Sequence, residues 1–370
     1  VTFIQKKKKN SVAGVPCPPC EGGTAIAEWR NDMDKIGMVH RDSLSCEAIV
    51  RKLPDGSLLL LSQCGGMGEP CPENRVLVFH SADGETWSKP SLIREENGRA
   101  LYATDVDVNG NVVTAYITEH NGGYLDTDCY ALVSRDGGNS WQRQELPVFR
   151  NTFVFLRGTI RTADGLTLIA YQHYPITREE NDALIAAGKN VLESKLPAVL
   201  CGTLLSRDGV HFEKSNDISI PNSFGGKRIW QWPEPTIVQL THGFAMLLRI
   251  NGAGVLYRSD SADGRTWSLP RPTDIPNPNN KPKLIRMQDG AVALINTPNP
   301  ALGMKHRNPL EIWISDDDMR TWRYKKRVLD FPGWLSYPDG FADGKRIVFS
   351  FEVNRHDIYL ADCDVSDFYA

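Results

Sequence analysis

The heptapeptide SADGETW (residues 81–87) is the first of five related turns that recur along the chain. The others read SRDGGNSW (134–141), SRDGVHF (206–212), SADGRTW (261–267) and SDDDMRTW (315–322), and their first serines are separated by 53, 72, 55 and 54 residues. Each turn has a Ser two residues before an Asp, so side-chain oxygens can accept backbone N–H groups in a tight turn. We call this motif an Asp box. A short apolar strand precedes every box, and five boxes in register with strands indicate a repeat architecture rather than isolated hairpins.

A second repeat consists of apolar alternation on both sides of a short turn, which is the sequence pattern of a β-hairpin. Its six copies occupy residues 48–62, 105–118, 158–172, 235–249, 282–296 and 338–352. Six hairpins predict an all-β fold, a six-bladed β-propeller with Asp-box repeats. The last copy is followed by the strand-like DIYLAD but by no Asp box. We expect AIAEW (25–29) to supply the missing outer strand, so that N- and C-terminal strands close the ring.

The predicted domain organisation is an N-terminal arm over residues 1–24 and a single propeller domain over residues 25–370. Only the stretch 178–194 is typical of a helix, and it is expected to lie over one face. Formal net charge is −3 and Lys and Arg are scattered, which argues against nucleic acid as a partner. No apolar run approaches the roughly 20 residues of a membrane span, and we expect a soluble chain from which any export signal has been removed.

Eight cysteines give no clear indication of the redox compartment, because a chain of 370 residues does not need disulfides to fold. Cys17 and Cys20 form a CPPC motif, which is compatible with redox chemistry or with half of a zinc site. No second CxxC and no paired His completes a ligand set. We therefore expect no metal site and no cofactor.

Alignment of the six hairpins predicts where a site would lie. In a propeller the innermost strands surround a central axis, so the residues just before them should face one shared mouth. These residues are polar in every blade: Glu47, Thr104 or Asp105, Arg157, Glu234, Lys281 and Tyr337. Because buried charges are costly unless paired, the set indicates either a binding site or a ring of salt bridges that plugs the channel.

From about residue 45 onward the chain resembles the sialidase (neuraminidase) superfamily of Asp-box, or BNR-repeat, propellers. WPEPTIVQLTHGFAMLLR (232–249) is similar to the family's segment with a Glu and an Arg, here Glu234 and Arg249. NTPNPALGMKHRNPLEIWIS (296–315) resembles the segment with the next Arg, here Arg307. GWLSYPDGFADGKRIVFSFE (333–352) resembles the segment with the catalytic Tyr, here Tyr337, and closes on an acidic residue, Glu352.

The resemblance implies a retaining glycoside hydrolase in which Tyr337 is the nucleophile and Glu234 its base. An anomeric carboxylate repels a carboxylate nucleophile, which explains the use of a tyrosine. A phenol with a pKa near 10 needs a neighbouring base. Arg249 and Arg307 would bind the substrate carboxylate through bidentate hydrogen bonds. Blade-to-blade salt bridges, for the arginines, and an ordinary buried hydroxyl, for Tyr337, are the structural alternatives.

Two family positions differ in this chain. The first family Arg precedes the first hairpin, where SCEAIV has Ser45 instead, and Arg41 or Arg157 would have to replace it. The family's acid/base Asp lies in the following loop, where CGGMGEPCPENR (64–75) contains none. Glu69 is the nearest candidate acid and Glu73 the second.

Further side chains are expected near the same mouth. Glu47, Arg157, Lys281 and Trp232 are candidate substrate-binding residues, with Trp230 and Trp334 as further stacking surfaces. His173, beside Tyr174 at the end of the third hairpin, is a candidate acid or base. Ordinary packing is the alternative for each aromatic side chain, and a structural role is the alternative for His173.

Three functions remain open from the sequence. The first is an exo-acting, sialidase-like glycoside hydrolase for an acidic sugar or a related glycan. The second is a polysaccharide lyase or another uronate-processing propeller, with a Tyr or His that abstracts a proton. The third is a non-catalytic propeller that binds glycans or proteins, since fold does not fix function. A carbohydrate, as oligosaccharide or glycoconjugate, is the expected substrate, and the resemblance favours a secreted or periplasmic location.

Overall fold

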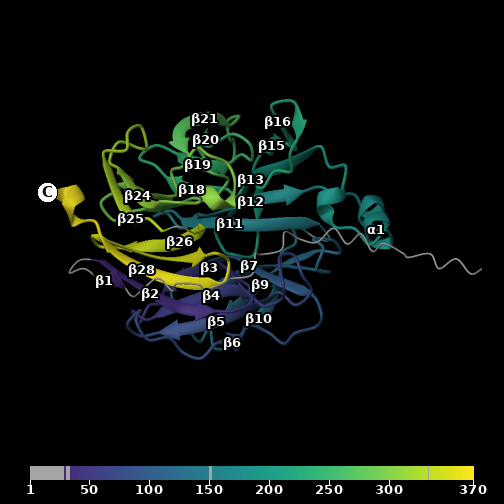
Figure 1. The fold of residues 1–370 in the computed structure, drawn as a ribbon, viewed down its shortest axis with the longest axis horizontal. Helices are drawn as coiled ribbons and strands as arrows, with labels where there is room; N and C mark the ends of the chain where they lie inside the picture. The colour runs from purple at the N-terminus through teal and green to yellow at the C-terminus, as the bar shows by residue number, and fades with distance from the viewer. Residues whose placement is uncertain (1–28, 31–33, 150–151, 332) are drawn as a thin grey trace, which may run out of the picture.

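Figure 1 shows the chain as a computed structural model that describes residues 29–30, 34–149, 152–331 and 333–370. The expected N-terminal arm, with Cys17 and Cys20, lies outside the described residues. Within them, the strands form six antiparallel sheets, one for each predicted hairpin, and a small two-stranded ribbon. The fold is a six-bladed β-propeller, as the sequence predicted.

The blades follow one another along the chain, and each is built outward from its innermost strand. Blades one to three comprise β3 (Ser45–Lys52), β4 (Leu58–Cys64), β5 (Arg75–Ser81), β6 (Ser91–Leu92); β7 (Ala100–Asn109), β8 (Val112–His120), β9 (Asp128–Ser134), β10 (Gln142–Glu145); and β11 (Phe153–Arg161), β12 (Thr167–Tyr174), β13 (Ala198–Ser206), β14 (Glu213–Lys214) and β15 (Ile218–Pro221). Blades four to six comprise β18 (Thr236–Gln239), β19 (Phe244–Arg249), β20 (Val255–Ser261), β21 (Arg271–Pro276); β22 (Lys283–Arg286), β23 (Val292–Asn296), β24 (Leu310–Ser315), β25 (Tyr324–Leu329); and β26 (Leu335–Asp343), β27 (Arg346–Val353), β28 (Asp357–Asp364), β2 (Asp34–Arg41) and β1 (Trp29–Arg30). The ribbon pairs β16 (Ser223–Phe224) with β17 (Lys227–Arg228).

The innermost strands contact one another in a closed order, from β3 through β7, β11, β18, β22 and β26 back to β3. Apolar side chains fill the spaces between neighbouring blades, as between blades five and six. The polar residues predicted from the hairpins lie within these inner strands or directly before them and are thus gathered around one axis. This arrangement positions the site described below.

Blade six joins the two ends of the described chain. In Figure 1 the yellow strands β26 and β28 lie beside the purple strands β1 and β2. On the outer side of β28, the pairing strand is β2, with Ile36 opposite Ala361. It lies C-terminal to the segment 25–29 that the sequence suggested, of which only Trp29 is described, in β1 at the edge of the sheet. The alternation in β2 is weak because only two of its eight residues, Asp34 and Ile36, are buried, so its sequence does not resemble a typical strand.

The Asp boxes form the turns that the sequence predicted. In the blade-four box, the Ser261 hydroxyl accepts the Gly264 N–H at 2.8 Å, and the Asp263 carboxylate accepts the Thr266 N–H at 2.9 Å. These backbone hydrogen bonds hold the pKa of Asp263 below its ordinary value. Trp267 then donates its indole N–H at 2.9 Å to a threonine hydroxyl of β13. The box therefore connects blade four to blade three as well as closing its own turn.

The predicted helical stretch 178–194 contains α1 (Arg178–Ala186) and a 3-10 turn, Val191–Glu193. Thr177 caps α1 by accepting the Glu180 N–H. Two further 3-10 turns are Met304–His306 and Ser366–Tyr369. Over the ranges that the structure describes, no helix has the length and apolarity needed to cross a bilayer.

Candidate active site

A cavity of about 160 Å³ lies at the mouth of the axis. Four of the inner-strand residues predicted from the hairpins line it: Glu47, Arg157, Glu234 and Tyr337. Lys281 is buried beside it, with Nζ 5.3 Å from the centre of the Tyr337 ring. The indexing of the blades thus located one shared polar mouth.

The backbone turns three of these side chains inward. Glu47, Glu234 and Tyr337 have φ angles of 48°, 40° and 53°, a region that residues other than Gly adopt uncommonly. β-bulges include Glu47 in β3 and Tyr337 in β26. A bulge re-aims a side chain, and such backbone strain, on the order of 1–3 kcal/mol per residue, is concentrated at functional sites. The strained positions are therefore candidates for chemistry.

Tyr337, Glu234 and Arg249 form a hydrogen-bonded triangle inside the cavity. The Tyr337 hydroxyl donates to Oε1 of Glu234 at 2.7 Å, and the Arg249 guanidinium donates to Oε2 at 2.6 Å. Arg249 also lies 3.3 Å from the Tyr337 oxygen and is oriented by Asn251 at 2.9 Å. Burial, and after it the charge of Glu234, raises the pKa of Tyr337 far above its ordinary value. The phenol is therefore protonated, and its proton points at the carboxylate that could accept it.

Arg307 presents its charge to the same cavity without a carboxylate partner among the described residues. It donates to the Ser336 hydroxyl at 3.0 Å and to the Asn279 carbonyl at 2.7 Å, while its Nε has no partner there. Its guanidinium carbon lies 5.4 Å from the centre of the Tyr337 ring. Burial lowers the pKa of Arg307 because charge is being held away from water. A bound anion would compensate that cost.

Glu69 stands on another wall of the cavity, in the loop between β4 and β5. Its carboxylate forms an ion pair with Arg355 and accepts the Tyr124 hydroxyl at 3.2 Å. The second candidate acid, Glu73, is exposed, contacts the Cys71 thiol and does not line the cavity. Of the two candidates, the structure brings Glu69 to the site.

Sequence reasoning missed two of these wall residues, Arg355 and Tyr124. Arg355 lies in the turn between β27 and β28, three residues after Glu352, and adopts a φ of 63°. Its guanidinium approaches Cys46, next to Ser45, at 3.7 Å. A basic residue in a turn at the mouth end of an inner hairpin was the available signal. Arg355 thus brings a guanidinium close to the position where the family's first Arg was expected.

The two residues proposed as replacements for that Arg have other partners. Arg41 is exposed and pairs with Asp357 at 2.5 Å, outside the cavity. Arg157 lines the cavity but donates two hydrogen bonds, at 2.7 and 3.1 Å, to Glu47. Burial opposes ionisation of Glu47, yet Arg157 and Lys281 outweigh it and hold its pKa below the ordinary value. This pair matches the structural alternative of a salt bridge across the channel.

Deeper in the channel, a second set of ion pairs joins neighbouring inner strands. Arg51 pairs with Asp105 at 2.7 Å and with Asp339, which also accepts Lys283 at 3.1 Å. Thr104, the other candidate from blade two, donates its hydroxyl to a backbone carbonyl of β8. A salt-bridge plug therefore exists, but it lies below the cavity and not in place of it.

Of the three tryptophans predicted near the mouth, the structure places only Trp232 in the wall of the cavity. Trp232 lines the cavity beside Phe155 and Tyr124, whereas Trp334 lines a smaller neighbouring cavity. Trp230 stacks on Tyr174, 5.6 Å between ring centres, in the core next to it. His173 does not line the cavity.

His173 instead contacts the Thr152 hydroxyl at 2.8 Å through Nε2. Burial, and after it the charge of Lys214, lowers the pKa of His173 to about 4. The structural alternative fits His173 better than a role as acid or base.

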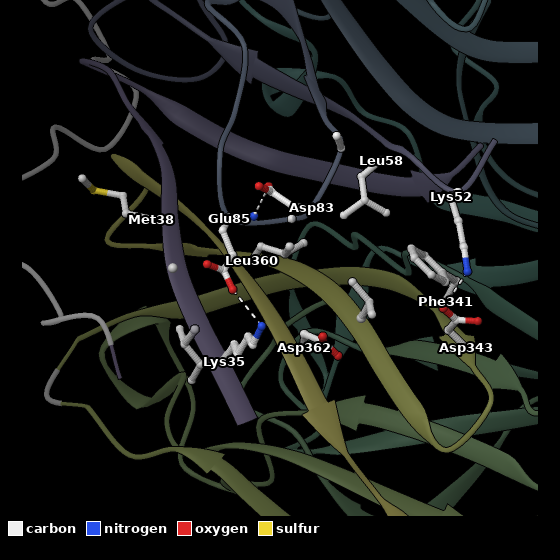
Figure 2. Close-up of a pocket in the computed structure, with 16 residues that line it drawn as sticks. Lys35, Met38, Lys52, Leu58, Asp83, Glu85, Phe341, Asp343, Leu360 and Asp362 are labelled. Carbon is white, nitrogen blue, oxygen red and sulfur yellow. Dashed lines mark hydrogen bonds and ion pairs between the residues drawn. The ribbon is translucent and has the colours of Figure 1, made fainter. Parts of the chain in front are cut away.

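A separate, larger cavity of about 210 Å³ lies at the rim between blades six and one. Figure 2 shows its lining, where Leu58, Phe341 and Leu360 are flanked by the ion pair Lys35–Glu85. None of the predicted site residues lines it, and its charged groups are largely paired. Size alone does not make it the better candidate for chemistry.

The sequence matches the family described as "BNR repeat-like domain" over residues 95–348. The chain belongs to this family. The match covers more than half of the chain and includes four of the five Asp boxes. A search of the curated proteins finds no match.

Solved sialidases share this BNR-repeat propeller fold. Hadza microbial sialidase Hz136 superposes with a TM-score of 0.70 at 16% identity, over 88% of this chain and 67% of that one. The Trypanosoma rangeli sialidase gives 0.61 at 13% identity, over 88% and 55%. The NanB sialidase from Streptococcus pneumoniae gives 0.62 at 15% identity, over 90% and 70%. The chain thus shares the propeller fold of these sialidases, and it spans about 55–70% of their length.

Proposed function

We propose that this BNR-repeat propeller is a sialidase-like glycoside hydrolase that removes an acidic sugar from the end of a glycan. The observation that carries the proposal is the hydrogen bond of 2.7 Å from the Tyr337 hydroxyl to Glu234. The same cavity is lined by Arg249 and by Arg307, which has no carboxylate partner among the described residues. Tyr337 and Glu234 would serve as nucleophile and base, and the two arginines would bind an anion beside them.

In the first step, the Tyr337 oxygen forms a bond to the anomeric carbon while its proton passes to Glu234. The glycosidic C–O bond breaks, and Glu69 protonates the leaving oxygen. In the second step, Glu69 takes a proton from water, the water oxygen attacks the anomeric carbon, and Tyr337 leaves and recovers its proton from Glu234. Glu69 takes up the proton for the first step from solvent when substrate binds, and Tyr337, Glu234 and Glu69 end the second step in the protonation states of the substrate complex.

Arg355 supports the choice of an acidic sugar, because the carboxylate of such a substrate could displace Glu69 from Arg355. In the free protein Glu69 is paired with Arg355. A substrate carboxylate that binds Arg249 and Arg307 would compete with Glu69 for Arg355. Release from Arg355 makes protonation of Glu69 more favourable, because an opposite charge no longer stabilises its ionised form.

The test is hydrolysis of a panel of aryl glycosides of acidic and neutral sugars. We expect turnover of an acidic member, with a loss of at least about a thousandfold in kcat for Tyr337→Phe and a clear loss for Glu234→Gln. Glu69→Gln should impair substrates with poor leaving groups most, and Glu73→Gln, in the same loop, is the matched control. Unchanged turnover in both Tyr337→Phe and Glu234→Gln would refute the proposal. A product that absorbs in the ultraviolet through a new double bond would identify a lyase instead.

A further inference from the structure

Three side chains of the kinds that bind transition metals converge where blade six meets blade one. They are His40 in β2, Asp42 just after it, and Cys64 at the end of β4. One ligand atom from each lies within 4.8 Å of the others. The sequence drew attention to Cys17 and Cys20 as metal ligands, and this cluster is independent of them.

The partners of these three groups leave them available to a cation. Nε2 of His40 is a buried atom with no hydrogen-bond partner among the described residues. The Cys64 side chain is fully buried, and its sulfur contacts the Ser45 hydroxyl at 3.6 Å, a weak hydrogen bond. Asp42 accepts its neighbour's backbone N–H at 2.6 Å through one carboxylate oxygen and faces Arg75 at 3.5 Å through the other. A buried ring nitrogen without a partner is costly, and a metal ion would satisfy it.

A set of one nitrogen, one sulfur and one carboxylate oxygen selects the class of metal. Mg²⁺ and Ca²⁺ prefer oxygen ligands, whereas Zn²⁺ combines Cys, His and Asp in tetrahedral sites. In such a site the ligand atoms lie roughly 3.3–3.8 Å apart, so these side chains need to move by about 1 Å. A thiolate, a carboxylate and a neutral imidazole together balance the charge of the ion. Arg75 keeps a second partner in Glu96, at 3.3 Å, when Asp42 turns to the metal.

The place of the cluster in the fold indicates its role. β2 belongs to blade six through its pairing with β28, whereas β4 is a central strand of blade one. The ring between these blades is closed by noncovalent contacts within the described residues. We propose that His40, Asp42 and Cys64, with a water molecule as the fourth ligand, form a structural zinc site that fastens the closing strand of blade six to blade one. The proposal is independent of the hydrolase activity, since these residues do not line the axial cavity.

The experiment uses the full chain, stripped of metal with a chelator and then titrated with zinc sulfate. To exclude zinc binding by the CPPC motif, the Cys17→Ser/Cys20→Ser variant is the parent for all comparisons. We expect one zinc per chain and a rise of several degrees in the midpoint of thermal unfolding. His40→Gln and Cys64→Ser should each abolish both effects. Cys363→Ser is the matched control, because Cys363 is a buried cysteine in blade six outside the cluster. This variant should keep both the zinc stoichiometry and the rise in the unfolding midpoint.

Cobalt gives a readout that a purely structural effect of the substitutions would not produce. Co²⁺ bound in the parent should show a thiolate-to-metal absorption band in the near ultraviolet, and this band should disappear in Cys64→Ser. If either variant fails to fold, Asp42→Asn, at the more exposed edge of the cluster, should weaken zinc binding at least tenfold. The proposal is overturned if the parent binds no zinc, or if stoichiometric zinc persists in His40→Gln and Cys64→Ser.

Discussion

Glu352 is a fully buried carboxyl group near the end of β27. One oxygen accepts the Glu47 backbone N–H at 3.1 Å, and the other has no hydrogen-bond partner among the described residues. Burial raises the pKa of Glu352 to about 8 against the attraction of Arg307. The folded protein therefore favours the neutral carboxyl group at this position, next to the place where the family's first Arg would stand.

This raised pKa predicts a pH dependence of stability. The folded chain keeps a proton on Glu352 that the unfolded chain releases near the ordinary value of 4.5. The contribution of Glu352 to stability is complete below about pH 4.5 and is lost as the pH rises through about 8. Relative to Glu352→Gln, the parent should lose up to about 1.4 kcal/mol of unfolding free energy per pH unit in this window. Denaturant unfolding from pH 6 to 9 measures it, with the exposed Glu95→Gln as control. A difference that does not change with pH would contradict the shifted pKa.

Arg307 gives a second prediction at the scale of the residue. Its planar fork matches a carboxylate in a way that a lysine ammonium does not. For an acidic substrate, Arg307→Lys should lower kcat/KM about 10- to 100-fold, mainly through KM, because a hydrogen bond to a charged group contributes about 1.5–3 kcal/mol. The exposed Arg320→Lys is the matched control. An equal loss on a neutral glycoside would show that Arg307 acts on the fold rather than on the substrate carboxylate.

At the scale of the element, the Asp box predicts a stability effect without an effect on activity. The buried Ser261 hydroxyl accepts the Gly264 N–H at 2.8 Å and the Asp263 N–H at 3.4 Å. Ser261→Ala should cost about 1 kcal/mol of unfolding free energy while kcat stays unchanged, because the box lies on the blade rim. Denaturant unfolding and a turnover assay check both parts. Ser219→Ala, an exposed strand position in blade three, should change neither quantity.

The elements also show what the sequence could and could not predict. Hairpins and Asp boxes depend on residues close together in the chain, so their positions were predictable from turn chemistry and alternation. β2 was not, because most of its residues are not buried and its strand character comes from pairing with β28. Arg355 was missed for a similar reason: its approach to Glu69 joins two loops 286 residues apart in sequence. The candidate site was therefore predictable where inner strands position it, and not where loops do.

At the scale of the whole molecule, the indexing of six repeats around one axis was the decisive step. It predicts that polar residues far apart in the sequence, among them Glu47, Arg157 and Tyr337, are neighbours in space. It left open whether Arg157 binds a ligand or forms a salt bridge, and the pairing of Arg157 with Glu47 depends on side-chain directions across the channel. The zinc site proposed above is invisible in sequence for the same reason, since Cys64 reaches His40 only after the ring closes.

The composition of blade six from both ends of the described chain also bears on how the protein is made. β2 leaves the ribosome more than 300 residues before its partner β28. A contact of such long sequence separation forms slowly, because the entropy of closing the loop must be overcome first. Tyr337 and Arg355 both belong to this last blade. A nascent chain can therefore hold five blades and Glu234 and still lack a complete site, which forms only after blade six has been synthesised.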